Sequence, residues 1–268
     1  MLRIHIINKT KILKKFIHNI YMVSVVSSIL FFSISTIAYF IIKYLIADKF
    51  SARNQGIAMA CTAVYLATIV AVQTYINVTN AKERCGGTPQ TLRAIYYTFV
   101  PYLFIFGTLM LVLMFFPGFK APFSNTLGYG FVSLPFMNIK PTFMNILKTD
   151  SNNKLLKTVY EDPSLMINEM TPQNFFVFLQ KMDDAENSIL SPDYKRFIPD
   201  LYNLVTIKNS VSKFVWFMLT GILVILNSHS YISSMKCIRS VDELSGKLDK
   251  AFSNPKKEKK KQKWKLGY

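Results

Sequence analysis

Four long apolar stretches alternate with short polar segments along this chain of 268 residues. They cover residues 21–42, about 56–76, about 94–116 and about 214–235. Each is about 20 residues long, which is the length that a helix needs to cross a hydrocarbon core of about 30 Å. We therefore predict an all-α integral membrane protein with four transmembrane helices.

The second apolar stretch differs from the others because it is rich in alanine and threonine. Small side chains let helix backbones approach one another closely within a membrane. This pattern predicts that the second helix lies inside the bundle rather than against lipid. The residues concerned are Ala58, Ala60, Thr62, Ala63, Ala67, Thr68 and Ala71.

Residues 117–140 form a polar, glycine-rich and aromatic segment at the point where the third span leaves the membrane. We expect a rigid membrane-exit turn here, with glycines and Pro117 permitting its backbone path and aromatic rings anchoring it at the bilayer surface. The candidate residues of this turn are Pro117, Gly118, Phe123, Ser124, Asn125, Thr126, Gly128, Tyr129 and Gly130.

Residues 141–213 contain repeated helix-start signals and no useful run of alternating apolar and polar positions. Pro141, Pro163, Pro172 and Pro192 each lie near the start of a short stretch with an apolar face, which suits a first helical turn. We predict a small helical extramembrane domain between spans three and four. The predicted organisation is thus an N-terminal segment at 1–20, three spans within 21–116, the exit turn at 117–140, the domain at 141–213, the fourth span at 214–235 and a tail at 236–268.

Composition and charge agree with this division. Hydrophobic residues make up 51% of the chain and charged residues only 18%, against about 25% charged in a typical soluble protein. Residues 117–213 hold ten basic and nine acidic residues, whereas the rest holds 22 and six, which accounts for +16 of the net charge of +17. The positive-inside rule predicts cytosolic termini and a domain on the opposite side.

Both termini are basic. Residues 1–20 suit either a short amphipathic helix on the membrane surface or a simple basic tail, leading into an uncleaved first span. The C-terminal lysines have four open interpretations: contact with anionic lipid, with nucleic acid or with an acidic protein face, or a solvated tail that fixes the topology. These lysines are Lys256, Lys257, Lys259, Lys260, Lys261, Lys263 and Lys265.

Residues 126–130, Thr-Leu-Gly-Tyr-Gly, differ at one position from the loop whose carbonyl groups select potassium in channels. The surroundings argue against a filter, because no pore helix precedes the motif and the next apolar run, residues 131–139, is too short to cross a membrane. An ion channel, or a transporter, therefore stays the alternative to a structural role.

No enzyme signature appears in the chain, and we expect no catalytic residue, no cofactor and no metal site. The three cysteines and three histidines are scattered, without a Cys-x-x-Cys pair. Cys85 and Cys237 both lie at membrane exits on the same predicted side. They would pair if the second and fourth spans are neighbours, and a Cα separation above about 7 Å would exclude the bond.

Three segments together resemble a multi-span inner-membrane virion protein of nucleocytoplasmic large DNA viruses. They are Cys-Gly-Gly-Thr-Pro-Gln at 85–90, Phe-Pro-Gly-Phe-Lys-Ala-Pro-Phe-Ser-Asn-Thr-Leu-Gly-Tyr at 116–129, and Tyr-Glu-Asp-Pro-Ser-Leu-Met-Ile-Asn-Glu at 160–169. The resemblance covers about residues 85–169, and Phe119 stands where the family pattern has tryptophan.

The resemblance implies a structural role in the virus particle and names no catalytic residues. Such a protein would lie in the virion inner membrane, derived from host endoplasmic reticulum, and would link the bilayer to capsid or minor capsid proteins. The resemblance also implies a virus that supplies its own thiol oxidase. Such an enzyme would permit a disulfide on the cytosolic side. The oligomeric state and the partner stay open.

Overall fold

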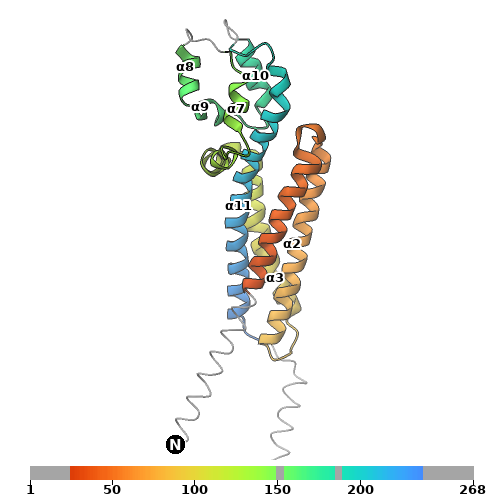
Figure 1. The fold of residues 1–268 in the computed structure, drawn as a ribbon. Helices are drawn as coiled ribbons and strands as arrows, with labels where there is room; N and C mark the ends of the chain where they lie inside the picture. Colours follow the sequence, from red (N-terminus) through yellow and green to blue (C-terminus); the bar gives the residue numbers. More distant parts are fainter. Residues whose placement is uncertain (1–24, 149–153, 185–188, 238–268) are drawn as a thin grey trace, which may run out of the picture.

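The computed structural model describes residues 25–148, 154–184 and 189–237, and shows a bundle of four long helices with a helical domain at one end (Figure 1). The four helices are Val25–Asp48, α2 (Gln55–Arg84), the consecutive α3 (Thr91–Pro101), η3 (Tyr102–Phe106) and α4 (Gly107–Phe115), and α11 (Ile198–Ser234). All four are long and apolar enough to cross a membrane. The prediction of an all-α integral membrane protein with four spans is confirmed. Residues 1–20 and the lysine tail lie outside the described residues.

The first two helices extend further than hydropathy predicts. The first continues beyond Ile42 through a π-helical turn, η1 (Tyr44–Asp48), and is followed by the 3₁₀ turn η2 (Phe50–Ala52). Lys43 and Asp48 form an ion pair across the π-helical turn. Since a π turn repeats every five residues, it brings these two side chains onto one face. Helix α2 runs on to Arg84 because polar residues after Ile76 still form helical turns outside the apolar region.

Aromatic side chains fill the centre of the bundle. Phe32 and Tyr39 from the first helix, Tyr65 from α2, Phe106 from η3 and Phe217 from α11 are all buried in one cluster. The rings of Tyr39 and Tyr65 stack with centroids 4.3 Å apart. Aromatic pairs add about 0.5–1.5 kcal/mol beyond the area they bury.

The alanine- and threonine-rich face of α2 does not lie inside the bundle. Ala60, Ala63, Ala67, Thr68 and Ala71 are exposed in this chain, so the prediction of a buried second helix is wrong. The buried stripe of α2 repeats every four residues on a different face, and Tyr65 and Ile69 of this stripe meet the aromatic centre. Its members are Tyr65, Ile69, Gln73, Asn77 and Ala81.

Polar side chains connect the spans within the bundle. Gln73 donates a hydrogen bond to Ser28 at 3.1 Å, and Asn77 donates one to Thr98 at 2.8 Å. The hydroxyl groups of Thr36 and Tyr65 lie 2.9 Å apart. Such bonds each contribute on average about 0.6 kcal/mol to the packing of membrane helices.

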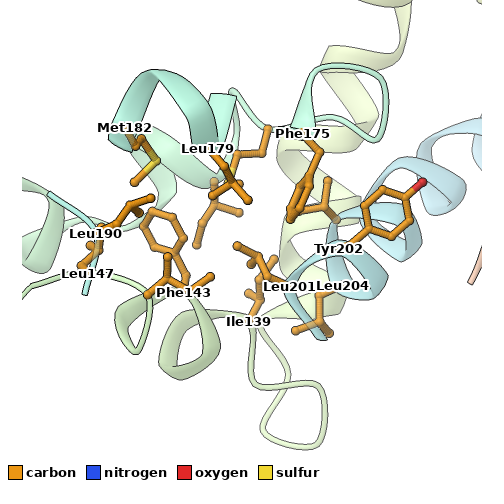
Figure 2. Packing of buried hydrophobic residues seen from close by; sticks show 14 of the residues in the cluster. Ile139, Phe143, Leu147, Phe175, Leu179, Met182, Leu190, Leu201, Tyr202 and Leu204 are labelled. Carbon is orange, nitrogen blue, oxygen red and sulfur yellow. The ribbon is translucent and has the colours of Figure 1, made fainter. Parts of the chain in front are cut away.

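The extramembrane domain consists of short helices around a core of its own (Figure 2). An isolated bridge between Leu147 and Leu190 closes the side of the domain. The helices are α7 (Ile139–Met144), α8 (Lys154–Glu161), α9 (Ser164–Ile167), α10 (Phe175–Asp183) and η6 (Tyr194–Phe197).

Helix α10 begins later than its sequence signal predicts. Pro172 suits a first helical turn, but the helix starts at Phe175 with Asn174 in the capping position. Thr171 and Asn174 instead bond reciprocally, with the Asn174 side chain accepting from the Thr171 N–H at 2.7 Å and the Thr171 hydroxyl accepting from the Asn174 N–H at 3.2 Å. These bonds form a closed turn in front of the helix.

Helix α11 belongs to both the domain and the membrane bundle. The end of the predicted domain and the predicted fourth span belong to one helix of 37 residues, about 55 Å long at 1.5 Å per residue. Leu201 and Val205 lie in the domain core, Phe217 and Val224 lie in the membrane core, and Ile232 packs at the far end. One rigid element therefore passes through all three hydrophobic clusters.

Candidate functional site: the membrane-exit segment on α11

The membrane-exit segment is helical and is not a glycine-rich turn. It consists of η4 (Pro117–Lys120), α5 (Ala121–Phe123), η5 (Ser124–Gly128) and α6 (Tyr129–Val132). In Figure 1 the part after Lys120 is seen nearly end-on beside α11, so its axis crosses that of α11. We expected a turn because glycine and proline punctuate the segment, yet Pro117 and Pro122 lie in first helical turns, where proline is tolerated.

Two side chains of α11 hold the start of the exit segment. The buried Ser212 hydroxyl donates to the carbonyl of Lys120 at 2.7 Å, and the Trp216 indole N–H donates to the carbonyl of Phe119 at 2.9 Å. The rings of Phe123 and Trp216 meet edge to face, with centroids 5.1 Å apart. The carbonyl groups at the start of the exit segment are thus tied to the long helix, directly after the third apolar helix ends at Phe115.

Gly128 is required for close approach rather than for an unusual backbone conformation. Its φ is −64°, which is ordinary for a right-handed helix. A Cβ atom at this position would lie 2.4 Å from the carbonyl oxygen of Lys208 on α11. A Cβ atom at Gly118 or Gly130 would meet nothing within 4 Å. The prediction that the glycines permit a special path is therefore wrong, and only Gly128 among the three is sterically constrained.

Lys208 joins the exit segment to the segment that contains Asp162 and Pro163. Its side chain is fully buried, and its ammonium group donates to the carbonyl of Ile167 at 2.7 Å, at the C-terminal end of α9. A cation at the end of a helix is stabilised by the carbonyl groups there. The exit segment and the end of α9 thus meet on either side of one lysine of α11.

The start of α9 is stabilised by Asp162. Its carboxylate accepts hydrogen bonds from the Ser164 hydroxyl at 2.6 Å and from the Ser164 N–H at 3.0 Å. These bonds to the charged form lower the pKa of the Asp162 carboxyl. The Asp-Pro-Ser motif therefore has a structural explanation as a helix start.

The outward side of the exit segment is apolar. Phe119, Leu127 and Phe131 are exposed there, and Lys140 lies over the ring of Tyr129 with its ammonium group 5.9 Å from the ring centroid. Exposed apolar side chains beside a transmembrane bundle suit contact with the headgroup region of a bilayer. Ser124 is buried and Asn125 is half-buried, whereas Thr126 is exposed and its hydroxyl donates to the carbonyl of Pro122, one turn earlier.

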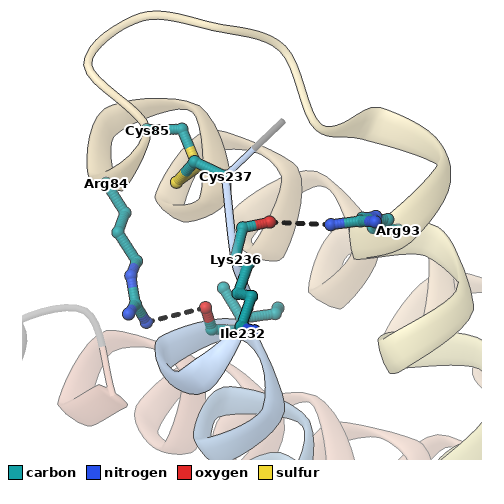
Figure 3. Close-up of a disulfide and its surroundings, with 6 residues drawn as sticks. All are labelled: Arg84, Cys85, Arg93, Ile232, Lys236 and Cys237. Atoms are coloured by element: carbon teal, nitrogen blue, oxygen red, sulfur yellow. Dashed lines mark hydrogen bonds between the residues drawn. A yellow bond between two sulfur atoms is a disulfide. The ribbon is translucent and has the colours of Figure 1, made fainter. Parts of the chain in front are cut away.

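The opposite end of the bundle carries the predicted cysteine pair (Figure 3). Cys85 and Cys237 are joined by a disulfide, with Cα atoms 5.5 Å apart. Arg84 donates to the carbonyl of Ile232 at 2.9 Å, and Arg93 donates to the carbonyl of Lys236 at 2.7 Å. The loop between α2 and α3 is thus fastened covalently and by two arginines to the end of α11.

The glycines next to Cys85 have positive φ angles and do require glycine. Gly86 has φ +65° and Gly87 has φ +94°. The Gly87 N–H donates to the carbonyl of Lys82 at 2.9 Å, which is the six-to-one bond of a Schellman helix end. This helix end turns the chain so that Cys85 faces α11.

No known protein family, curated protein or solved structure matches this chain. The candidate site therefore rests on its geometry. No group of three or more histidine, cysteine, aspartate or glutamate residues suited to a metal ion occurs among the described residues.

Several residues that organise this site escaped the sequence analysis. Lys208, Ser212 and Trp216 lie in a run that we had divided between a domain helix and a span. Their spacing of four residues places them on one face of a helix. This four-residue spacing indicates a shared helix face. The predicted boundary between domain and span at residue 213 divided the three residues between two elements.

Proposed function

We propose that this protein is an architectural membrane protein of a large DNA virus particle, which holds a helical domain at a fixed position above the internal lipid membrane. In this role the domain contacts capsid or minor capsid proteins. The observation that carries the proposal is the continuity of α11, which is core to both the domain and the bundle. A linker of coil would let the domain move independently, whereas a continuous helix transmits force between shell and membrane.

The exit segment and the disulfide support the same role. Ser212 and Trp216 fix the segment against α11, and the bond between Cys85 and Cys237 fixes the other end. The viral assignment itself rests on the resemblance of residues 85–90, 116–129 and 160–169. A virus with its own thiol oxidase would explain a disulfide at the end where basic residues predict the cytosol.

A potassium channel is the weaker candidate. Residues 126–130 lie in η5 and α6, where the Tyr129 carbonyl accepts from the Ser133 N–H at 2.9 Å. Channel filters need carbonyl groups that are free to replace the water around an ion. In this arrangement the motif packs against α11 through Gly128 instead.

The domain surface offers exposed apolar groups for a protein partner. Leu165, Phe176 and Val177 are exposed, and we expect a capsid-side partner to cover them. Crosslinking mass spectrometry on intact particles tests this: links from Lys157 or Lys181 to a capsid protein are expected. Absence of the protein from purified particles would refute the viral role, and potassium flux through the purified protein in liposomes would favour the channel.

A further inference from the structure

A cleft lies at the membrane boundary between α11, the first helix and α2, and it has a polar part and an apolar part. The polar part has a volume of about 380 Å³ and lies below the domain; it is lined by Arg53, Asn54, Tyr202 and Asn209, among others. The apolar part has a volume of about 570 Å³ and reaches into the bundle. The two parts share Asp48, Gln55, Ala58, Gln173, Ser210 and Lys213, so they form one continuous cleft.

The charges along this cleft are unbalanced. Lys43, Arg53, Lys120 and Lys213 line it together with one acid, Asp48, which gives a formal charge of +3. Asp48 already forms an ion pair with Lys43. The rest of the cleft therefore holds three cations without a carboxylate among its described lining residues.

Lys120 differs from the other cations of the cleft because it is buried. Its side chain is only 4% exposed, yet its ammonium group has no hydrogen-bond or ion-pair partner within the part of the chain that the structure describes. Burial lowers the pKa of this lysine. Lys213 likewise has no acceptor among the described residues, and both lysines line the apolar part of the cleft. Neither ammonium nitrogen is among the fully buried polar atoms that lack a partner, and Lys213 is half-buried, so both nitrogens are accessible to an anion from the cleft.

The floor of the cleft is suited to a hydrocarbon chain. It is formed by apolar side chains from the first helix, α2, α4 and α11, including Phe40, Leu66, Leu113 and Phe217. At its rim, Met59 of α2 and Met114 of α4 are 69% and 71% exposed. Because these two residues belong to membrane spans, the cleft opens sideways toward lipid.

We propose that this cleft binds one anionic phospholipid, with its phosphate at Lys120 and Lys213 and an acyl chain along the apolar floor between α2 and α4. Positive charge without counter-charge at the membrane boundary is what an anionic headgroup complements. The apolar extension distinguishes a lipid from a soluble anion, which would leave the floor empty. The lipid would bridge the domain and the bundle at the point where η1 and η2 turn back toward α2.

The test uses the full-length protein purified in detergent. Native mass spectrometry after titration with phosphatidylglycerol or phosphatidylcholine measures the affinity of each lipid. We expect phosphatidylglycerol to bind at least tenfold more tightly, and the variant Lys120→Gln/Lys213→Gln to lose that preference. The matched control Lys181→Gln/Lys195→Gln removes two exposed lysines of the domain and is expected to change the affinity less than twofold.

A second variant keeps the test decisive if the double lysine change affects folding. Ala58→Leu adds bulk where the two parts of the cleft join, and it is expected to weaken phosphatidylglycerol binding without changing any charge. Equal binding of the two lipids would overturn the proposal, as would unchanged binding by both variants. Competition by millimolar inorganic phosphate that displaces the lipid completely would also overturn it, because it would assign the site to a soluble anion.

Discussion

Replacing Gly128 by alanine tests whether the exit segment is held against α11 by close backbone contact. The new Cβ atom would lie 2.4 Å from the Lys208 carbonyl oxygen, whereas ordinary contact begins at 3.4 Å. The two helices would have to separate by about 1 Å, since backbone on both sides cannot turn away. Overpacking of this kind costs about 1–3 kcal/mol. The higher helix propensity of alanine offsets about 1 kcal/mol.

Gly130→Ala is the matched control, two residues further along the exit segment, in α6. Its Cβ atom would meet nothing within 4 Å, so it keeps the gain in helix propensity without the clash. We therefore expect Gly128→Ala to be less stable than Gly130→Ala by about 1–3 kcal/mol, or roughly 2–4 °C in melting temperature for each kcal/mol.

The assay follows exposure of Cys61 during heating with a thiol-reactive fluorogenic dye in detergent. Cys61 is the free thiol, because the chain has three cysteines and the other two are bonded, and it packs against the membrane core. Equal melting temperatures for the two variants, or a Gly128→Ala protein more stable than the wild type, would refute the reasoning.

Three other predictions follow from particular contacts. Cys85→Ser/Cys237→Ser is expected to lower the stability of the bundle by roughly 2–4 kcal/mol, measured by the same melting assay; an unchanged melting temperature would contradict a bonded pair. The hydrogen bonds from Ser164 hold the pKa of the Asp162 carboxyl below its usual range, so its stabilising effect is present above the unfolded pKa and lost as the pH falls through the folded pKa. NMR titration of the carboxyl should show a higher pKa in Ser164→Ala; no rise would contradict the capping role. Asn77→Ala removes the hydrogen bond to Thr98 and is expected to lower the free energy of unfolding by about 0.6–1.7 kcal/mol. Thr68→Ala, on the exposed face of α2, should lower it by less. Similar losses of stability in the two variants would contradict the packing of α2 against α3.

The membrane spans were predictable because the physical requirement is simple. A bilayer core of about 30 Å demands about 20 apolar residues, and hydropathy alone reveals them. The helical domain was predictable for a similar reason, since proline and capping residues mark helix starts locally. The boundary at residue 213 was wrong because Lys208 and Lys213 interrupt the apolar run without interrupting the helix.

The exit segment could not be understood from the sequence because a glycine has two different uses. Gly86 serves a positive φ, whereas Gly128 serves a close contact with a helix 80 residues away. The need for glycine at position 128 becomes visible only when the Lys208 carbonyl group is placed beside it in the folded chain. The same limit applies to α2, whose small residues indicate that close packing is possible but do not say which face meets the bundle.

The disulfide between Cys85 and Cys237 turns most of the molecule into a covalent ring. Its two ends are separated by 152 residues, so the ring includes the third span, the exit segment, the domain and α11. A protease that cuts any loop within that ring leaves the protein as a single covalent molecule. After a single cut in the domain, the fragment with the first three spans and the fragment with α11 stay in one covalent molecule, and they become separate chains only when the disulfide is also reduced.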